Sequence, residues 1–372
     1  MSSLSPGQKV VVSELAETPV EAIERFVSVV AQEAPDPATL ASTDVLVEVK
    51  SASVGWVDLI MTSGQYQHVP APPYTPGLEY AGVVVWKGSA VGDRLDLGDR
   101  VLADGALTGP RSLGAHQRWG GWAKYAVAPV EALLRIPGKL DFDQGCNLLG
   151  NYETAYHCLI ARGRLAAGET VLILGASGAT GLAAVQIAKL SGATVIATGR
   201  SHQKLALVAQ HGADHLVVTE SDGAGVKPFR HQVKALTGGR GVDVVYDGVG
   251  GALSVESLRC TRFGARFLIV GWASTPFVAK GKGGRGAPNV NQLPTNLIIM
   301  KGLDVLGCPT VIATLNDPSI RAPRLAKILE WAERGELHPH VSHRFPLARI
   351  HDAMRAKWSG EVTGGAVVHP DN

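Results

Sequence analysis

Three kinds of segment follow one another between residues 170 and 192, and their order restricts the fold more than any other part of the chain. Residues 171–174, Val-Leu-Ile-Leu, are too few for a helix and rich in branched side chains, which predicts a strand buried on both faces. Residues 175–178 predict a tight turn, because two of the four are glycine. From residue 179, small and apolar residues continue at helical spacing to Gly192, a natural helix end.

A strand, a glycine turn and a helix in this order can bind an anion. The start of the helix presents backbone N–H groups without partners and the positive end of the helix dipole. Gly178 and Gly181 carry no side chain that would keep a pyrophosphate away. Ordinary strand-turn-helix units share this spacing, so the neighbouring segments have to decide. The residues expected to bind the phosphates are Gly175, Ser177, Gly178, Ala179, Thr180 and Gly181.

Further segments downstream have the composition of strands and alternate with helix-like stretches such as residues 201–212. Strands and helices that alternate in this way predict an α/β Rossmann fold with a doubly wound parallel sheet. Ligands of such sheets lie at the carboxyl ends of the strands. The expected strands after the first are residues 192–200, 215–219, 242–251 and 265–274.

The end of the second expected strand bears on the choice between the two nicotinamide cofactors. NAD-binding proteins usually carry Asp or Glu there to bind the ribose hydroxyls. Residues 198–204 contain two cations and no carboxylate. Arg200, Ser201 and Lys204 would suit a 2′-phosphate, since Arg offers a planar fork and Lys a point charge. The sequence therefore favours NADPH; the alternative is that Arg200 and Lys204 only form a solvated helix start.

Composition and charge argue against several other classes of protein. The chain has 372 residues, with 35 Lys or Arg and 33 Asp or Glu, so its net charge is only +2. The basic cluster at residues 279–286 contains four glycines and no aromatic residue, which favours a loop over a nucleic-acid patch. No run approaches the roughly 20 apolar residues of a membrane span, and residues 1–17 contain no signal-peptide core. We therefore expect a cytoplasmic protein that binds neither nucleic acid nor membranes.

The cysteines and histidines show no spacing typical of metal ligands. Because the cysteines are far apart and form no CxxC pair, they are expected to be buried, apolar and free. The cysteines are Cys146, Cys158, Cys260 and Cys308. Three histidines, His338, His340 and His343, are expected to alternate along a partly exposed strand. No metal site is expected.

The first 145 or so residues predict a largely β domain. Residues 8–15 and 44–54 alternate between apolar and polar side chains, as half-buried strands do. Residues 20–34 fit either a helix or a short helix that runs into a strand, and periodicity does not decide. Residues 54–88 are dense in Pro and Gly at their centre, so they predict loops of the kind that carry sites. Residues 97–104 and 120–129 predict further strands.

Seven motifs, in this order along nearly the whole chain, resemble the medium-chain dehydrogenase/reductase superfamily. Within it the chain is similar to the zinc-independent branch of quinone oxidoreductases and enoyl reductases. The motifs are GQY (64–66), PGLEYAGVV (76–84), GDRV (98–101), GGWAKY (120–125), TAY (154–156), GASGATGLAAVQIAK (175–189) and NLIIMKGLDVLG (296–307).

The resemblance implies a GroES-like, mostly β catalytic domain interrupted by the Rossmann domain. The expected boundaries are residues 1–146, 147–313 and 314–372, the last segment returning to the catalytic domain. In that segment two amphipathic helices flank a strand with the sequence HVSHRFPL, and GAVVHP forms a last strand. Relatives are commonly dimers joined at the edge strands of their nucleotide sheets, so a homodimer through residues 303–307 is expected.

Zinc alcohol dehydrogenases of the superfamily carry a Cys in the first loop and a His in a PGHE motif. Here the first loop reads GWVD and the motif reads PGLE, with Leu78 in place of His. Zinc catalysis needs about three N, S or O ligands, and at least two are missing. The cysteine-rich lobe that holds structural zinc is also missing, because residues 102–121 contain no Cys.

Without a metal, other groups must stabilise the charge that hydride addition creates. Hydride addition to an enoyl compound leaves an enolate, which needs hydrogen-bond donors and a proton. Tyr66 falls where enoyl thioester reductases of the mitochondrial type keep a proposed proton donor, and its spacing from Asp58 agrees with that group. The resemblance therefore implies Tyr66 and Asp58 as catalytic residues. An equally open alternative is that Tyr66 only packs over the nicotinamide.

Other positions agree with the family's pattern or depart from it. Thr154 falls where relatives bind the cofactor, Asn151 or Tyr152 is a candidate for the same cleft, and Gly271 and Trp272 are expected beside the nicotinamide. Gly55 stands where many relatives have Asn, and Gly365 where many have Lys. Residues 107–121 and 279–289 resemble insertions that shape the entrance to the cleft.

Together these observations predict an NADPH-dependent reductase of an activated carbon-carbon double bond, an enone or enoyl compound, or of a quinone. An alcohol or aldehyde dehydrogenase is the first alternative, disfavoured by the missing zinc ligands. A nucleotide-binding protein without turnover is the second, since the superfamily contains lens crystallins.

Overall fold

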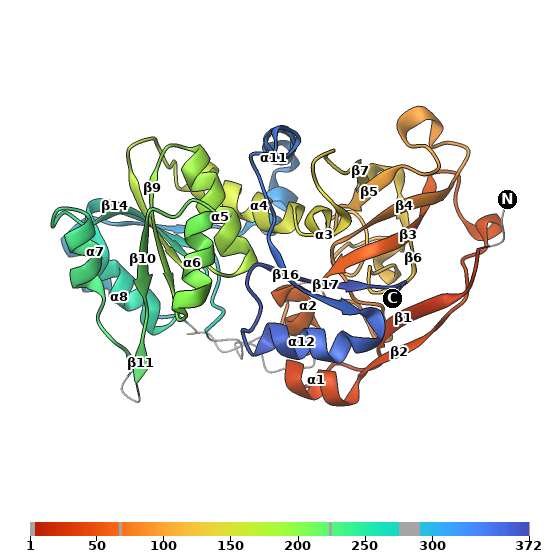
Figure 1. Cartoon of the computed structure of the whole chain (residues 1–372), viewed down its shortest axis with the longest axis horizontal. Helices are drawn as coiled ribbons and strands as arrows, with labels where there is room; N and C mark the ends of the chain where they lie inside the picture. Colours follow the sequence, from red (N-terminus) through yellow and green to blue (C-terminus); the bar gives the residue numbers. More distant parts are fainter. Residues whose placement is uncertain (1–3, 67–68, 223–224, 275–290, 372) are drawn as a thin grey trace. The chain divides into compact units, whose positions relative to one another are not determined.

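The computed structural model describes residues 4–66, 69–222, 225–274 and 291–371. Contacts between residues divide these into two compact units (Figure 1). The first unit contains the described residues up to 150 and those from 338 onward, and the second contains those between 151 and 337. Of the two candidate insertions, residues 107–121 belong to the described part of the chain, whereas residues 279–289 lie outside it.

The second unit contains the predicted parallel sheet. Its strand order is β10-β9-β8-β13-β14-β15, and every neighbouring pair is parallel. The chain leaves β8 towards one edge and returns beside it as β13, so the carboxyl end of β8 is a topological switch point. The strands are β8 (Thr170–Leu174), β9 (Thr194–Gly199), β10 (His215–Val218), β13 (Val242–Asp247), β14 (Thr261–Ile269) and β15 (Asp304–Gly307).

Helices cover both faces of this sheet, which confirms the Rossmann prediction. Helices α5 and α6 pack on β8, β9 and β10, and α8 and α9 pack on β13 and β14. Leu172 and Leu174 share one face of β8 and join a buried cluster with Phe229 and Leu258. The helical elements are α4 (Leu149–Tyr156), the π-helix η5 (His157–Arg162), α5 (Ala179–Leu190), α6 (His202–Gln210), α7 (Arg230–Leu236), α8 (Ala252–Cys260), α9 (Thr295–Lys301), α10 (Thr310–Asn316), η6 (Pro318–Ile320) and α11 (Arg321–Arg334), with a small hairpin of β11 (Ser221–Asp222) and β12 (Gly225–Val226).

The first unit is mostly β, as predicted. Its larger sheet has the order β16-β17-β3-β4-β5-β7, and β6 pairs with β3 outside this path. Its strands are β1 (Gly7–Val12), β2 (Val27–Gln32), β3 (Asp44–Ser53), β4 (Tyr80–Lys87), β5 (Arg100–Ala103), β6 (Tyr125–Pro129), β7 (Leu133–Arg135), β16 (Val341–Pro346) and β17 (Gly365–His369). Its helical elements are α1 (Pro19–Arg25), η1 (Pro37–Thr39), α2 (Trp56–Met61), η2 (Gly92–Arg94), η3 (Ala115–Arg118), η4 (Val130–Ala132), α3 (Phe142–Gly145), η7 (Leu347–Arg349) and α12 (Ile350–Trp358).

The ambiguous residues 20–34 are a short helix that runs into a strand. Thr18 caps α1 by accepting a hydrogen bond from Glu21 N, and Pro19 occupies the first helical position. The next strand, β2, pairs antiparallel with β1 over six residues. These contacts, rather than periodicity, fix where the helix ends.

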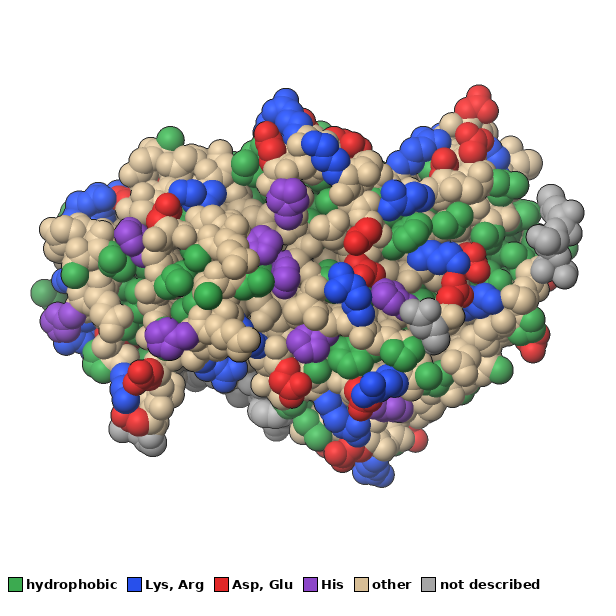
Figure 2. All heavy atoms as spheres, in the orientation of Figure 1, with side chains coloured by type: hydrophobic (Ala, Val, Ile, Leu, Met, Phe, Trp, Pro, Cys, Tyr) green, Lys and Arg blue, Asp and Glu red, His purple; other side chains and the backbone are tan. Residues whose placement is uncertain are grey.

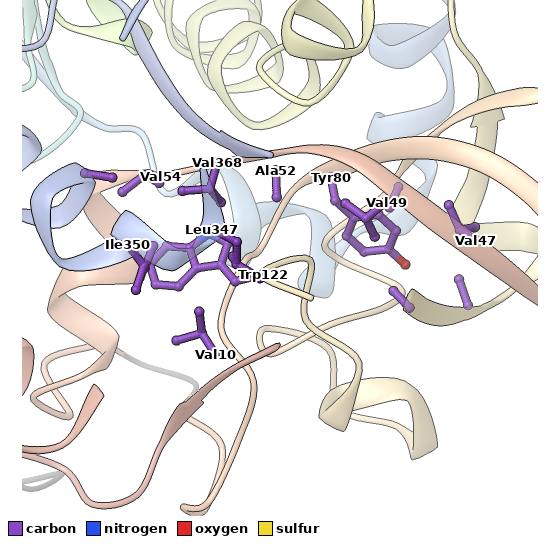
Figure 3. Close-up of a cluster of buried hydrophobic side chains, with 14 of the residues drawn as sticks. Val10, Val47, Val49, Ala52, Val54, Tyr80, Trp122, Leu347, Ile350 and Val368 are labelled. Carbon is purple, nitrogen blue, oxygen red and sulfur yellow. The ribbon is translucent and has the colours of Figure 1, made fainter. Parts of the chain in front are cut away.

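A buried tryptophan anchors the core of the first unit. Trp122 is fully buried, and its Nε1 donates a hydrogen bond to Ser53 O at 2.8 Å. Figure 3 shows its ring beside Val10, Leu347 and Val368. These neighbours come from the beginning and the end of the chain, so both ends contribute side chains to one core.

One boundary differs from the prediction. Residues 314–337, expected in the returning segment, pack with the second unit. Arg321 and Arg324 of α11 both bind the carboxylate of Glu153 on α4, with Nη2 to oxygen distances of 2.7 and 2.8 Å. This buried cluster holds α11 against the Rossmann helices, so only residues after 337 return.

The isolated cysteines are confirmed as buried and free. The histidine prediction is wrong in part, because only His343 lies in β16, whereas His338 and His340 precede it. Among the described residues, no group of three His, Cys, Asp or Glu side chains is arranged to hold a metal ion. No helix of the described residues has the length and apolar character to span a bilayer. On the face drawn in Figure 2, cationic and anionic side chains are interspersed.

Candidate active site

The turn after β8 is held in a conformation that glycine allows. Gly175 has φ +64°, which disfavours other residues. A Cβ at this position would also lie 2.8 Å from Val249 Cγ2, in the turn after β13. Ala176 N donates to Thr198 O of β9 at 2.9 Å, so the turn is fixed to the neighbouring strand β9. The predicted phosphate site therefore has a rigid base.

Helix α5 begins at this turn with an uncapped end. Its N-cap residue is Gly178, which is exposed and supplies no side-chain hydrogen bond. The first N–H groups of a helix have no carbonyl partner inside that helix. A Cβ on Gly178 would have only Gly175 O near it, at 3.4 Å, so the space in front of these N–H groups is open among the described residues.

The two glycines of this turn serve different purposes. A Cβ on Gly181 would lie 2.4 Å from Gly175 O, a distance that no real structure tolerates. Gly181 therefore lets α5 pack closely on the turn. The fold imposes no such requirement on Gly178, whose open surroundings suit the close approach of a ligand.

Helix α4 places polar groups beside the start of α5. Thr180 Oγ1 donates a hydrogen bond to Asn151 Oδ1 at 3.1 Å. Thr154 lies one turn after Asn151 and is half-buried. Tyr152, the other candidate for this cleft, is instead a core residue, because it is buried and its hydroxyl donates to Gln186 Oε1 at 3.0 Å.

The end of β9 presents the predicted 2′-phosphate residues. Arg200 is exposed and forms no ion pair with any described residue. Ser201 is the N-cap of α6, and its Oγ accepts a hydrogen bond from Lys204 N at 3.3 Å. Lys204 is half-buried in the first turn of α6. All three thus lie together at the strand end next to β8.

A buried carboxylate that sequence analysis missed organises the end of β13. Asp247 Oδ1 accepts hydrogen bonds from Val249 N and Gly250 N at 2.9 and 2.8 Å, and its other oxygen binds Ser254 Oγ. Burial raises the pKa of Asp247. Gly271 N donates to Asp247 O at 3.1 Å, which places Gly271 and the half-exposed Trp272 beside this turn. The sequence signal that could have identified Asp247 is an acidic residue at the end of an apolar strand.

In the first unit, Asp58 joins two loops. It lies in the first turn of α2, where Oδ2 accepts from Gly55 N at 2.9 Å. Oδ1 accepts from Gly77 N and Leu78 N at 3.2 and 3.0 Å. Burial raises the pKa of Asp58 to about 6, against the opposing effects of these backbone N–H groups and of the Arg111 guanidinium. Both oxygens are engaged by the backbone, so the carboxylate holds the loops in place.

Tyr66 lies in the loop that follows α2. Gly64 has φ +69°, and Gln65 N donates to Ile60 O at 3.0 Å, so the chain turns sharply before Tyr66. The ring of Tyr66 is half-buried, and its hydroxyl forms no hydrogen bond with a described residue, Asp58 included. The roles predicted for Tyr66 and Asp58 stay predictions.

Two residues near Asp58, Tyr74 and Arg111, carry no signal in the sequence. Tyr74 is buried, its hydroxyl has no partner among the described residues, and burial together with the Asp58 charge raises its pKa. Arg111 lies in the segment that resembles an insertion and acts on Asp58 electrostatically. No sequence pattern connects either residue with Asp58, since loops bring them together.

Comparisons with known proteins agree with this geometry. Two family models match: alcohol dehydrogenase GroES-like domain over residues 41–138 and zinc-binding dehydrogenase over residues 179–311. Quinone oxidoreductase-like protein 2 of Mus musculus is 32% identical over 331 residues, 88% of this chain and 86% of the mouse protein. The chain belongs to the medium-chain dehydrogenase/reductase superfamily, in its quinone oxidoreductase branch.

Solved structures of this superfamily match along almost the entire chain. A probable oxidoreductase of Mycobacterium abscessus is 28% identical, with a TM-score of 0.78 over 98% of this chain and 100% of that one. The quinone oxidoreductase of Escherichia coli complexed with NADPH is 23% identical, with a TM-score of 0.76 over 98% and 100% of the two chains. At that identity the second likeness shows the fold alone.

The structure explains one of the departures from the superfamily's pattern. A Cβ on Gly365 would lie 2.5 Å from Asn147 Oδ1, so the Asn147 amide fills the space that a side chain such as Lys would need. At Gly55 the only close atom is Asp58 Oδ2, 3.0 Å from a Cβ position. A side chain at Gly365 would therefore require the Asn147 amide to move, whereas at Gly55 it would meet the Asp58 carboxylate at a tight contact distance.

Asp58 makes the stability of the first unit depend on pH. Its pKa rises from an ordinary value near 4 to about 6 on folding, so its stabilising effect is present below about pH 4 and is lost as the pH rises through 6. We expect the free energy of unfolding of the wild type relative to Asp58→Asn to fall by on the order of 3 kcal/mol between pH 4 and 7. Urea unfolding across this range measures the difference.

The control is Asp36→Asn, which alters an exposed carboxylate that accepts from Ala38 N and should leave the wild-type slope unchanged. Parallel stability curves for the wild type and Asp58→Asn would show that Asp58 does not titrate as described.

Proposed function

We propose that this protein is an NADPH-dependent reductase of quinones or of activated carbon-carbon double bonds. The observation that carries the proposal is the open, uncapped start of α5 at the switch point of a parallel sheet. Its support is the 32% identity to a quinone oxidoreductase-like protein over 88% of the chain. The fold alone would not distinguish this activity from other nicotinamide chemistry.

The residues at the sheet edge fit a dinucleotide with a 2′-phosphate. The N–H groups at the start of α5 would bind the pyrophosphate, and Gly178 leaves room for it. Arg200 and Lys204 would neutralise the 2′-phosphate, since no carboxylate stands at residues 198–204 to bind the ribose hydroxyls. When bound, NADPH would supply a hydride. The E. coli relative with this fold was solved with NADPH.

The reaction would proceed without zinc. Leu78 stands where zinc alcohol dehydrogenases of the superfamily carry a His, and the GWVD stretch at residues 55–58 stands where they carry a Cys, so neither position supplies a Cys or His ligand. Charge on the acceptor must then be stabilised by hydrogen bonds and by fixed charges of the protein. Asp58 contributes by holding the Gly55 and Leu78 loops together through their backbone N–H groups.

Tyr66 is the proposed proton donor for enone and enoyl acceptors. Its half-buried phenol follows a sharply turned loop and forms no hydrogen bond with a described residue, so its proton is available. Reduction of an enone or enoyl acceptor needs a proton on carbon, whereas the reduced quinone can take its proton on oxygen, where solvent can supply it. The two acceptor classes should therefore differ in their dependence on Tyr66.

A homodimer is proposed through the edge strand β15. Helix α9, before this strand, exposes Ile299 and Met300 at 79% and 76%, and α10, after it, exposes Ile312 and Leu315. Unpaired edges beside exposed apolar side chains are typical of association surfaces. Light scattering of the full chain should give twice 39.0 kDa, whereas a mass of 39.0 kDa would contradict the dimer.

Arg200→Ala should weaken NADPH binding by about tenfold to a hundredfold, the usual cost of losing a charged hydrogen-bond partner. Affinity for NADH should stay unchanged, because NADH has no 2′-phosphate. Fluorescence titration with each cofactor measures both constants. Arg334→Ala, which removes a cation from the exposed end of α11, is the control, and equal loss of both cofactors in Arg200→Ala would refute the phosphate role.

Turnover is tested by mixing the protein with NADPH and either 1,4-naphthoquinone, an enone or an enoyl thioester, and following absorbance at 340 nm. Tyr66→Phe should lower kcat on the enone by about a hundredfold or more and change quinone turnover little. Tyr125→Phe is the control, since its hydroxyl binds Ser5 O.

An unchanged enone rate in Tyr66→Phe would remove the role of proton donor. NADPH binding without turnover of any acceptor would favour a binding protein over an enzyme, and oxidation of simple alcohols with NADP would favour an alcohol dehydrogenase.

A further inference from the structure

Arg111 is a half-buried arginine with most of its hydrogen-bonding capacity unused. Its Nε donates to Gly105 O at 3.3 Å. No carboxylate of the described residues lies within ion-pair distance of its guanidinium. An arginine side chain carries five N–H donors and stays charged at any ordinary pH. A partly desolvated guanidinium of this kind favours a negatively charged oxygen from outside the protein.

Other buried or half-buried arginines of the described residues form ion pairs with carboxylates. Arg324, for example, binds Glu153 through Nε and Nη2 at 3.0 and 2.8 Å. The carboxylate that acts electrostatically on Arg111 is Asp58, but both Asp58 oxygens accept hydrogen bonds from backbone N–H groups. Asp58 therefore places a negative charge near Arg111 but accepts no hydrogen bond from its guanidinium.

The segment that carries Arg111 is held firmly. Gly109 N donates to His116 O at 3.2 Å, and Gln117 Nε2 donates to Ser112 O at 2.9 Å. His116 Nε2 lies 2.8 Å from Asp44 Oδ1, which fastens the segment to the start of β3. These bonds hold the backbone on both sides of Arg111, and the Nε bond to Gly105 O orients its side chain.

That place is beside Leu78. A Cβ on Gly105 would lie 2.3 Å from Leu78 O and 3.3 Å from Arg111 Nη2, so Leu78 and the guanidinium both border Gly105. Leu78 N in turn binds Asp58. The guanidinium thus lies next to the loop that in zinc alcohol dehydrogenases carries a metal ligand.

We propose that the Arg111 guanidinium is an anion site that receives an oxygen of the acceptor. This inference rests on the proposed reductase function and names the chemistry that its substrate must offer: an oxygen that is negatively charged, or becomes so during the reaction, near the carbon that is reduced. Arg111 fixes that oxygen and stabilises its charge.

The charge balance of the step explains why a cation helps. A hydride brings one hydrogen and two electrons to the acceptor carbon, the C=C or ring π pair shifts, and the carbonyl oxygen ends with one negative charge. The guanidinium donates hydrogen bonds to this oxygen, and a proton from Tyr66 or from water then neutralises the product. A carboxylate already present on the acceptor would bind the same guanidinium before any reaction.

Arg111→Gln and Arg111→Lys separate these two sources of anion. The acceptors are 1,4-naphthoquinone, trans-4-oxo-2-pentenoate and the methyl ester of the latter. If the oxygen becomes charged during the reaction, Arg111→Gln should lower kcat by about tenfold to a hundredfold on every acceptor that the wild type reduces. If a substrate carboxylate is bound, KM should rise to the same extent for the acid alone. Arg111→Lys should restore part of either loss, because it keeps the charge.

Binding is measured independently of turnover, by saturation-transfer NMR with the non-reducible acid 4-oxopentanoate. The wild type should give a signal that Arg111→Gln lacks. Arg118→Gln is the matched control, because Arg118 lies in the same segment over the Trp119 ring and should leave every value unchanged. Thermal unfolding and NADPH affinity confirm that each variant is folded.

Values of kcat, KM and NMR signal within twofold of wild type in Arg111→Gln would overturn the proposal. A wild type that reduces none of the acceptors would refute the proposed function instead, and the NMR comparison would still decide whether Arg111 binds an anion.

Discussion

The first N–H groups of an α-helix have no carbonyl to bind within the helix, and the second unit of this protein is arranged to leave those of α5 accessible. Gly175 turns the chain at φ +64°, Gly181 lets the helix pack against that turn, and Gly178 adds no side chain in front of it. The parallel sheet places this end at the switch point, beside the turns that follow β9 and β13. The cofactor chemistry proposed here depends on that polarity.

In the first unit, a buried carboxylate holds two loops in place. Asp58 accepts hydrogen bonds from Gly55, Gly77 and Leu78, so one side chain fixes two loops that are 20 residues apart in sequence. Leu78, at the position that the resemblance aligns with a His of zinc relatives, is thereby held through its backbone N–H. In the proposed zinc-independent reduction the stabilising charge would come from side chains on neighbouring loops, and Arg111, which borders Gly105 next to Leu78, is the proposed cation.

Much of the fold was predictable because the signals were local. The run at residues 171–174 and the glycines after it predicted β8 and α5 correctly. A strand buried on both faces requires a continuous apolar run, and a tight turn requires glycine, so both are visible in the sequence. Residues 20–34 stayed ambiguous because α1 and β2 are too short to show a period. The place of α11 was missed because it depends on Glu153, which lies far away in sequence.

The site was less predictable than the fold for the same reason. The phosphate turn is one continuous segment, whereas the surroundings of Asp58 combine residues from three loops, and an Arg within an apparent insertion carries no signal of its own. Tyr152 was a candidate for the cofactor cleft but lies in the core. The sequence around a helix start is the same whether a tyrosine hydroxyl binds a ligand or, as here, the buried Gln186.

The most direct test of the account is the affinity of Gly178→Asp for NADPH, measured by calorimetry. Asp is a preferred N-cap residue, so its carboxylate should bind the N–H groups at the start of α5 and keep or raise thermal stability. The same carboxylate would occupy and repel the pyrophosphate. We predict that the variant folds at least as stably as the wild type and binds NADPH at least about a hundredfold more weakly, an estimate equal to the loss of two charged contacts. Wild-type affinity in a stably folded Gly178→Asp variant would contradict the account.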